Sequence, residues 1–135
     1  RGQDTGPDLD QGLMVARCRQ TGRPRRNELA TAKITSGICG FTATVRARKN
    51  GRKVMLEIDS DCAAIQALAA GLTEVDPFQE ITFRGQGPQT LKAGAEHCYH
   101  PACPVPVGII KAVEVESGLA LPAEARIELS KDGED

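Results

Sequence analysis

An alternating segment, a tight turn and a second alternating segment constrain the fold of this 135-residue chain more than any other feature. In FTATVRAR every second residue is apolar, as in a strand with one buried face. The apolar positions are Phe41, Ala43, Val45 and Ala47. Asn50-Gly51 follows, and we expect both residues to take the positive φ of a two-residue hairpin turn. KVMLEID then returns with Val54, Leu56 and Ile58 toward the core, so the sequence predicts an antiparallel hairpin.

Two later segments predict helices. SDCAAIQALAAGL is rich in alanine and leucine, which favour helices, and Ser60 or Asp61 can cap its start while Gly71 can end it. A second helix should start near Pro104 or Pro106, because proline is tolerated in the first turn. The residues of this second helix expected to face inward are Ile109, Ile110 and Val113.

Shorter segments complete the expected fold. Strands are expected over residues 31–36, in EITFR at 80–84 and in ARIELS at 125–130, with a loop over 85–97. Gly118 should end the second helix. This order of elements predicts an α+β fold, a two-layer sandwich with an antiparallel-rich sheet and two helices on one face.

Composition divides the chain into three parts. Residues 1–28 lack sustained apolar periodicity and include RCRQTGRPRR, which has five arginines in ten positions. We expect them to be a disordered or non-native extension, and a basic phosphate-binding arm is the alternative. Residues 29–131 are expected to form a single α+β domain, followed by an acidic tail over 132–135.

Charge and composition argue against several classes of partner. The net charge of −1 gives no general reason to expect a nucleic acid or a membrane, and three Phe, one Tyr and no Trp leave little for base stacking. No stretch approaches the roughly 18 apolar residues of a membrane span, and no export signal is recognisable, so a cytoplasmic location is expected. Phosphate-loop and nucleophile-elbow motifs are also missing from the sequence.

Five cysteines are many for a cytoplasmic chain. An odd number argues against a disulfide framework, so metal binding or thiol chemistry is favoured. Four of the five lie at expected element ends or in loops, whereas Cys18 lies in residues 1–28. These four are Cys39, Cys62, Cys98 and Cys103. Helix N-termini stabilise thiolates, although a free cysteine can also be a small buried hydrophobe.

The spacing of the four cysteines favours an iron–sulfur cluster over zinc. Structural zinc commonly takes C-x2-C pairs, and this chain has a single C-x4-C pair with two solitary cysteines. A cluster accepts thiolates from scattered loops. The sequence therefore predicts a cluster, with [4Fe–4S] favoured and Zn as the alternative. Its expected ligands are Cys39, Cys62, Cys98 and Cys103. His97 and His100 are candidates to replace a cysteine or to hydrogen-bond a sulfur.

Three functions are compatible with these residues. The first is a cluster protein for electron transfer, cluster delivery or sulfur handling, with a redox protein or metalloprotein as partner. The second is a binding module stabilised by zinc. The third is a thiol-based redox or sulfur-transfer enzyme, with Cys62 or Cys103 as nucleophile and Cys98 as resolving thiol.

Three blocks of the chain also resemble a known family. ITSGICGFTATV, LEIDSDCAAIQAL and CYHPACPVPVGIIKAVEVESGLALP are similar to the recurrent blocks of a small, functionally uncharacterised family found mainly in anaerobic prokaryotes. The resemblance covers about residues 30–130, and its blocks contain the four expected ligands but not Cys18. It implies no established activity, although an anaerobic setting is compatible with an oxygen-sensitive cluster.

Overall fold

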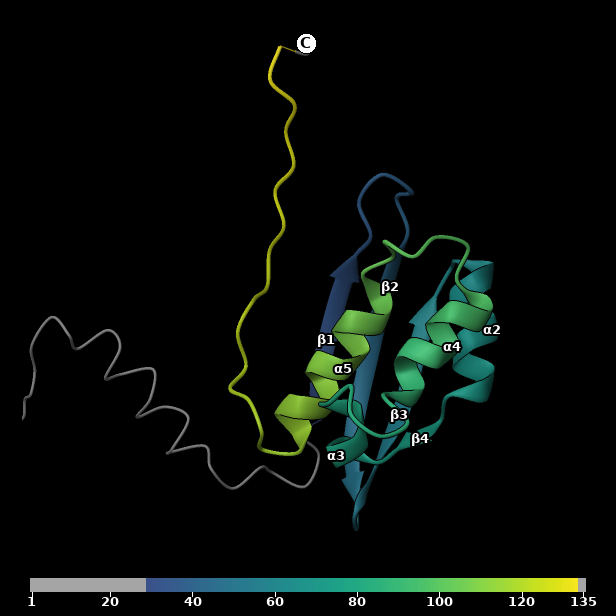
Figure 1. Cartoon of the computed structure of the whole chain (residues 1–135), viewed down its shortest axis with the longest axis vertical. Coiled ribbons are helices and arrows are strands. Elements are labelled where there is room, and N and C mark those ends of the chain that lie inside the picture. Colours follow the sequence, from purple (N-terminus) through teal and green to yellow (C-terminus); the bar gives the residue numbers. More distant parts are fainter. Residues whose placement is uncertain (1–28, 134–135) are drawn as a thin grey trace, which may run out of the picture.

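The computed structural model describes residues 29–133 and shows one antiparallel sheet with helices on one of its faces (Figure 1). The strands β1 to β4 lie side by side in sequence order and span Ala30–Thr35, Thr42–Asn50, Lys53–Ser60 and Glu74–Val75. The helices α2 to α5 span Ala63–Gly71, Pro77–Glu80, Gln89–His97 and Val105–Glu116. Helix α5 packs on β1 and β2 while α2 packs on β3, so the α+β fold class predicted from the sequence is confirmed.

The β2–β3 hairpin is confirmed, but its turn differs from the expected one. Ala43, Val45 and Ala47 are buried, as the alternation predicts. Phe41, expected on the same face, precedes the first residue of β2 and is 41% exposed, so its expected burial is wrong. Asn50 still pairs with Lys53, so the turn residues are Gly51 and Arg52. Among the described residues only glycines have positive φ, and Gly51 has 65°. The expectation of positive φ at Asn50 is therefore wrong, because the ladder extends one residue further and leaves the first turn position to glycine.

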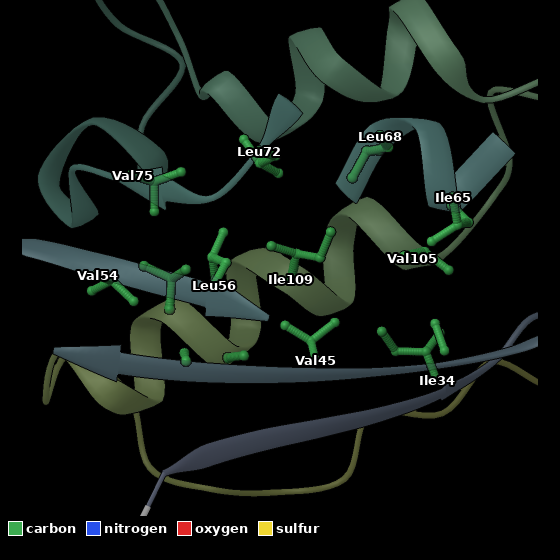
Figure 2. Packing of buried hydrophobic residues seen from close by; sticks show 14 residues of the cluster. Ile34, Val45, Val54, Leu56, Ile65, Leu68, Leu72, Val75, Val105 and Ile109 are labelled. Atoms are coloured by element: carbon green, nitrogen blue, oxygen red, sulfur yellow. The ribbon is translucent and has the colours of Figure 1, made fainter. Parts of the chain in front are cut away.

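The core lies between the sheet and the helices (Figure 2). Its largest fully buried apolar side chains are Val45, Val54, Ile65, Leu68, Val75, Val105, Ile109 and Val113. Cys62, Cys98 and Cys103 pack against this cluster and are partly buried. Three of the expected ligands therefore lie at the boundary between core and solvent.

Helix α2 forms where it was expected, although neither expected residue caps it. Its N-cap is Cys62, which makes no side-chain capping hydrogen bond. Ser60 is the last residue of β3, and its hydroxyl accepts a hydrogen bond from the Cys62 N–H at 3.1 Å. Gly71 is the last helical residue, as predicted.

Helix α5 also agrees with the sequence. It begins at Val105 with a proline in its first turn and buries Ile109 and Val113. Gly118 follows the C-cap residue Ser117 with a φ of 77°, which is the left-handed conformation that commonly ends a helix.

Helix α4 replaces an expected loop, and α3 takes part of an expected strand. EITFR is not a strand, since α3 ends at Glu80 and turns follow it. The buried Glu80 carboxylate accepts hydrogen bonds from the N–H groups of Gln89 at 2.7 Å and Thr90 at 3.1 Å. This cap comes from another helix, so the residues next to α4 do not contain a start signal. Two helices were expected on the sheet, and the described residues contain four.

The expected closing strand in ARIELS is also wrong. Residues 121–130 are exposed and lie outside any strand or helix, because no strand edge of the described chain pairs with them. A two-residue strand, β4, was not expected and pairs instead with the start of β3. Within residues 29–133 no helix has the length and apolar character needed to cross a membrane. The interpretation of residues 1–28 concerns positions outside the described range, so it stays a prediction.

Candidate functional site

Four cysteines lie where secondary-structure elements begin or end, and these element ends gather at one end of the molecule (Figure 1). The chain reaches this end in the β1–β2 loop, at the start of α2, and in the connection between α4 and α5. The cysteines at these places are, in order, Cys39, Cys62, Cys98 and Cys103. The strands β1 to β3 alternate in direction, and this topology brings residues distant in sequence to the same end.

Two of these thiols lie close enough to a third, Cys98, to influence its pKa. Burial raises the pKa of the Cys98 thiol to about 11, and the neighbouring Cys103 and Cys62 thiols add to the increase. Cys98 and Cys103 also share a side-chain hydrogen bond. Because a Cys98 thiolate would be partly buried and would be repelled by neighbouring thiolates, the Cys98 thiol favours its protonated form unless a cation or a covalent bond offsets these costs.

The C-x4-C segment folds back on itself between α4 and α5. Cys98 is the C-cap of α4, and its N–H donates to the Gly94 carbonyl at 2.9 Å. The Cys103 N–H donates to the His100 carbonyl at 3.3 Å, which closes a turn through Pro101. This turn explains how two thiols five residues apart come within hydrogen-bonding range.

Cys39 differs from the other three because it is exposed. Its loop closes through hydrogen bonds from the Ser36 N–H to Phe41 O at 3.0 Å and from the Gly40 N–H to Gly37 O at 2.9 Å. Gly37 and Gly40 have φ values of 88° and 78°, which glycine adopts most readily. Cys39 is not among the groups that shift the pKa of Cys98, so it lies at the same end of the fold without joining the three thiols.

The ligand assignment made from the sequence stays a prediction. Across residues 29–133, no three His, Cys, Asp or Glu side chains are arranged to hold a single metal ion. A site made of all four cysteines would require the exposed Cys39 thiol to approach the other three. Cys18 lies outside the described residues.

A cleft of about 420 Å³ opens beside the thiols. Cys98, His100 and Cys103 line it, together with apolar side chains that include Leu91 and Val107. Leu91 lies in α4, where the sequence predicts a loop, so no sequence pattern indicates it as a wall residue. His100 lines the cleft, whereas His97 is the last residue of α4 and does not.

The raised pKa of Cys98 predicts slow alkylation. With a pKa of about 11, roughly one Cys98 thiol in 1000 is ionised at pH 8, against about one in four for an ordinary thiol of pKa near 8.5. We expect Cys98 to react with iodoacetamide about 100-fold more slowly than an ordinary thiol at pH 8, as measured by peptide mass spectrometry. Its rate should rise about tenfold per pH unit up to pH 11 as the thiolate forms.

A control variant shows whether the raised pKa of Cys98, rather than poor access of the reagent to this thiol, makes its alkylation slow. Cys103→Ser removes one cause of the raised pKa, so Cys98 should react faster at pH 8 in that variant. Equal rates for Cys98 and the exposed Cys39 in the wild-type protein at pH 8 would contradict the prediction.

Comparison with known protein families identifies the chain's family. The model of a family of unknown function, DUF6951, matches residues 30–129. The matched span contains the whole sheet, helices α2 to α5, and Cys39, Cys62, Cys98 and Cys103. No curated protein and no solved structure matches the chain.

Proposed function

The chain belongs to DUF6951, a family of unknown function, and we propose that it is a small metal-binding protein that holds an iron–sulfur cluster. The proposed cluster is of the [4Fe–4S] type, with zinc as the alternative metal. Its proposed ligands are Cys39, Cys62, Cys98 and Cys103. The observation that carries this proposal is that the Cys103 and Cys62 thiols lie close enough to Cys98 to raise its pKa. Bound iron would remove the protons of these thiols and the repulsion between them.

Two helix N-termini next to the thiols add support. Cys62 is the N-cap of α2, and Cys103 lies two residues before α5. Neither helix has a side-chain cap, so backbone N–H groups of their first turns remain available to hydrogen-bond sulfur. Such N–H groups and the positive end of the helix dipole stabilise a negatively charged cluster.

The fourth ligand would come from the β1–β2 loop. This loop is exposed, and a Cβ added at Gly37 or Gly40 would meet no heavy atom within 4 Å. The proposal requires the loop to bring the Cys39 thiol toward the other three. Four cysteine ligands leave no open iron position, which favours electron transfer, cluster delivery or sulfur handling over catalysis at iron.

The proposed function also implies a cellular compartment and a kind of partner. Four free cysteines in the described residues suit a reducing compartment, so we place the protein in the cytoplasm. Its partner would be a redox protein or a metalloprotein that exchanges electrons, sulfur or a cluster with it.

Anaerobic reconstitution with iron and sulfide tests the cluster. We expect the wild-type protein to gain broad visible absorption and about four irons per chain. Cys62→Ser, Cys98→Ser and Cys103→Ser should each lose or convert the cluster, because each removes a ligand. Cys39→Ser should do the same, whereas Cys18→Ser should leave both absorption and iron content unchanged.

The other outcomes assign the protein differently. A colourless product with stoichiometric zinc would replace the cluster by a zinc-stabilised binding module. Full iron content in Cys39→Ser would remove Cys39 from the ligand set. If the protein binds no metal in any condition, the remaining function is that of a thiol-based redox or sulfur-transfer enzyme.

The hydrogen bond between Cys98 and Cys103 favours a dithiol as the second candidate. In this function Cys103 attacks a substrate disulfide, and Cys98 then attacks the mixed disulfide. The substrate leaves as two thiols while the Cys98–Cys103 disulfide forms. The high pKa of Cys98 suits a resolving thiol better than an attacking one. Trapping of a mixed disulfide by Cys98→Ser, but not by Cys103→Ser, would support it.

A further inference from the structure

The last described segment has the pattern of a strand and no strand to pair with. Residues 121–130, here called the C-terminal arm, follow α5 and run out past the body of the molecule (Figure 1). Every residue of the arm is exposed, and Ile127 and Leu129 expose 79% and 89% of their surface. In the described part of the chain the ion pairs of the arm are internal, from Arg126 to Glu124 and Glu128. An alternating apolar segment in water is unfavourable unless a surface covers it.

The sheet has an open edge that could accept such a strand. β1 is an outer strand of the sheet and pairs only with β2 within residues 29–133. The Ser36 N–H bonds to Phe41 O on the β2 side, so by alternation the backbone groups of Thr31, Lys33 and Thr35 point to the other edge. Unpaired edges of this kind are templates for an added strand.

The arm has one apolar and one charged face, and these suit the helix-covered face and the outer face of the sheet at the β1 edge. Its odd-numbered residues are apolar and its even-numbered ones include two glutamates, so one face can lie on the helix side and the other on the outer side. On the helix side, β1 packs closely on α5 at Gly108, which touches Ile34. On the outer side, the exposed Lys33 of β1 and Arg48 of β2 are basic. Glu124 and Glu128 of an added strand would complement this charge.

The geometry of the chain favours the arm of a second copy over the chain's own arm. Glu116, in the last turn of α5, accepts hydrogen bonds from the N–H groups of Ala30 at 3.2 Å and Lys49 at 2.9 Å. The arm therefore starts beside the first residue of β1, and pairing within one chain would have to be parallel. Pro122 favours an extended conformation of the preceding residue, and the arm that follows does not pair with β1 of its own chain. A second copy related by a twofold axis can pair antiparallel, which is slightly more stable, and can offer its own edge in return.

We propose that the protein forms a twofold dimer in which the arm of each copy adds to the β1 edge of the other. The exchange covers both open edges and buries the apolar faces of both arms. The family match extends through residue 129, so the arm belongs to the unit that the family shares. The dimer does not depend on metal binding, and its test is independent of the cysteines.

Sedimentation of the full chain over a range of concentrations tests the dimer. We expect a dimer for the wild-type protein at about 100 µM and a dissociation constant at least about 100-fold higher in Ile127→Ser with Leu129→Ser, since two apolar side chains per arm no longer stabilise the pairing. Arg126→Ser, on the opposite face of the same arm, should change the constant by less than about threefold. A monomeric wild-type protein, or a dimer that survives removal of residues 121–135, would overturn the proposal.

Hydrogen exchange distinguishes a second copy from pairing within one chain. The amides of Thr31, Lys33 and Thr35 should gain protection as the protein concentration rises, and lose it when the arm is removed. Arm-dependent protection that does not vary with concentration would show pairing within a monomer and would contradict the exchange.

Discussion

Glu80→Ala is expected to lower the free energy of unfolding by about 2–4 kcal/mol. The Glu80 carboxylate is 1% exposed and accepts hydrogen bonds from the N–H groups of Gln89 and Thr90, which start α4. Alanine would leave both donors without their partner and remove a negative charge from the positive end of the helix. Because Cys98 is the C-cap of α4, loosening this helix would also displace that thiol. Urea unfolding followed by circular dichroism measures the change.

Two controls accompany this variant. Thr90→Val removes a buried hydroxyl that has no hydrogen-bond partner among the described residues, so it should change stability by less than about 1 kcal/mol. Glu96→Ala removes an exposed carboxylate from the same helix and should have a similarly small effect. A loss below about 1 kcal/mol in Glu80→Ala would show that the cap contributes little.

Gly108→Val is expected to destabilise the protein by about 3 kcal/mol or more. Gly108 lies in α5 where the helix crosses β1, and a Cβ at this position would overlap Cδ1 and Cγ1 of the buried Ile34. The gain in helix propensity over glycine is smaller, at about 0.5 kcal/mol, so the steric overlap decides the sign. Thermal and urea unfolding of the purified variant measure the loss.

A double-mutant cycle identifies the cause. Ile34→Ala opens space at the crossing, so the cost of Gly108→Val should fall by more than about 1 kcal/mol in that background. Gly71→Val is the matched control, because a Cβ there meets nothing within 4 Å. If Gly108→Val destabilises the wild-type protein and the Ile34→Ala variant equally, the overlap with Ile34 is not the cause of the destabilisation.

Helix α4 shows why part of the fold was beyond sequence reasoning. Its segment contains Gly94 and follows a Gly- and Pro-rich stretch, which is typical of a loop. In the folded chain Gly94 is instead buried against Pro106 of α5, where a Cβ would come within 3.0 Å of the proline ring. The helix is thus stabilised by Glu80 at its start and by close packing along its length. Both partners come from other helices, so no local pattern contains them.

For the candidate site, too, the sequence predicts the local position of each cysteine, whereas the distances between the thiols depend on the tertiary structure. The sequence places each cysteine at an element end, and the structure confirms this for Cys62 at α2 and for Cys98 and Cys103 around the α4–α5 turn. Which thiols lie close together depends on the direction and packing of the helices. The structure brings Cys62 and Cys103 close enough to Cys98 to raise its pKa and leaves Cys39 exposed at the same end.

The sequence by itself determined the β2–β3 hairpin, helices α2 and α5 and the fold class. The reason is that side chains repeating every two residues or every 3.6 residues specify a buried face locally. Only the tertiary structure decided α3, α4 and the proximity of Cys62, Cys98 and Cys103, because their caps and neighbours come from distant residues. It also decided that ARIELS is not a strand in this chain, although the pattern predicts one. Alternation describes the faces of a strand, but a strand forms only when its backbone groups find an edge to pair with.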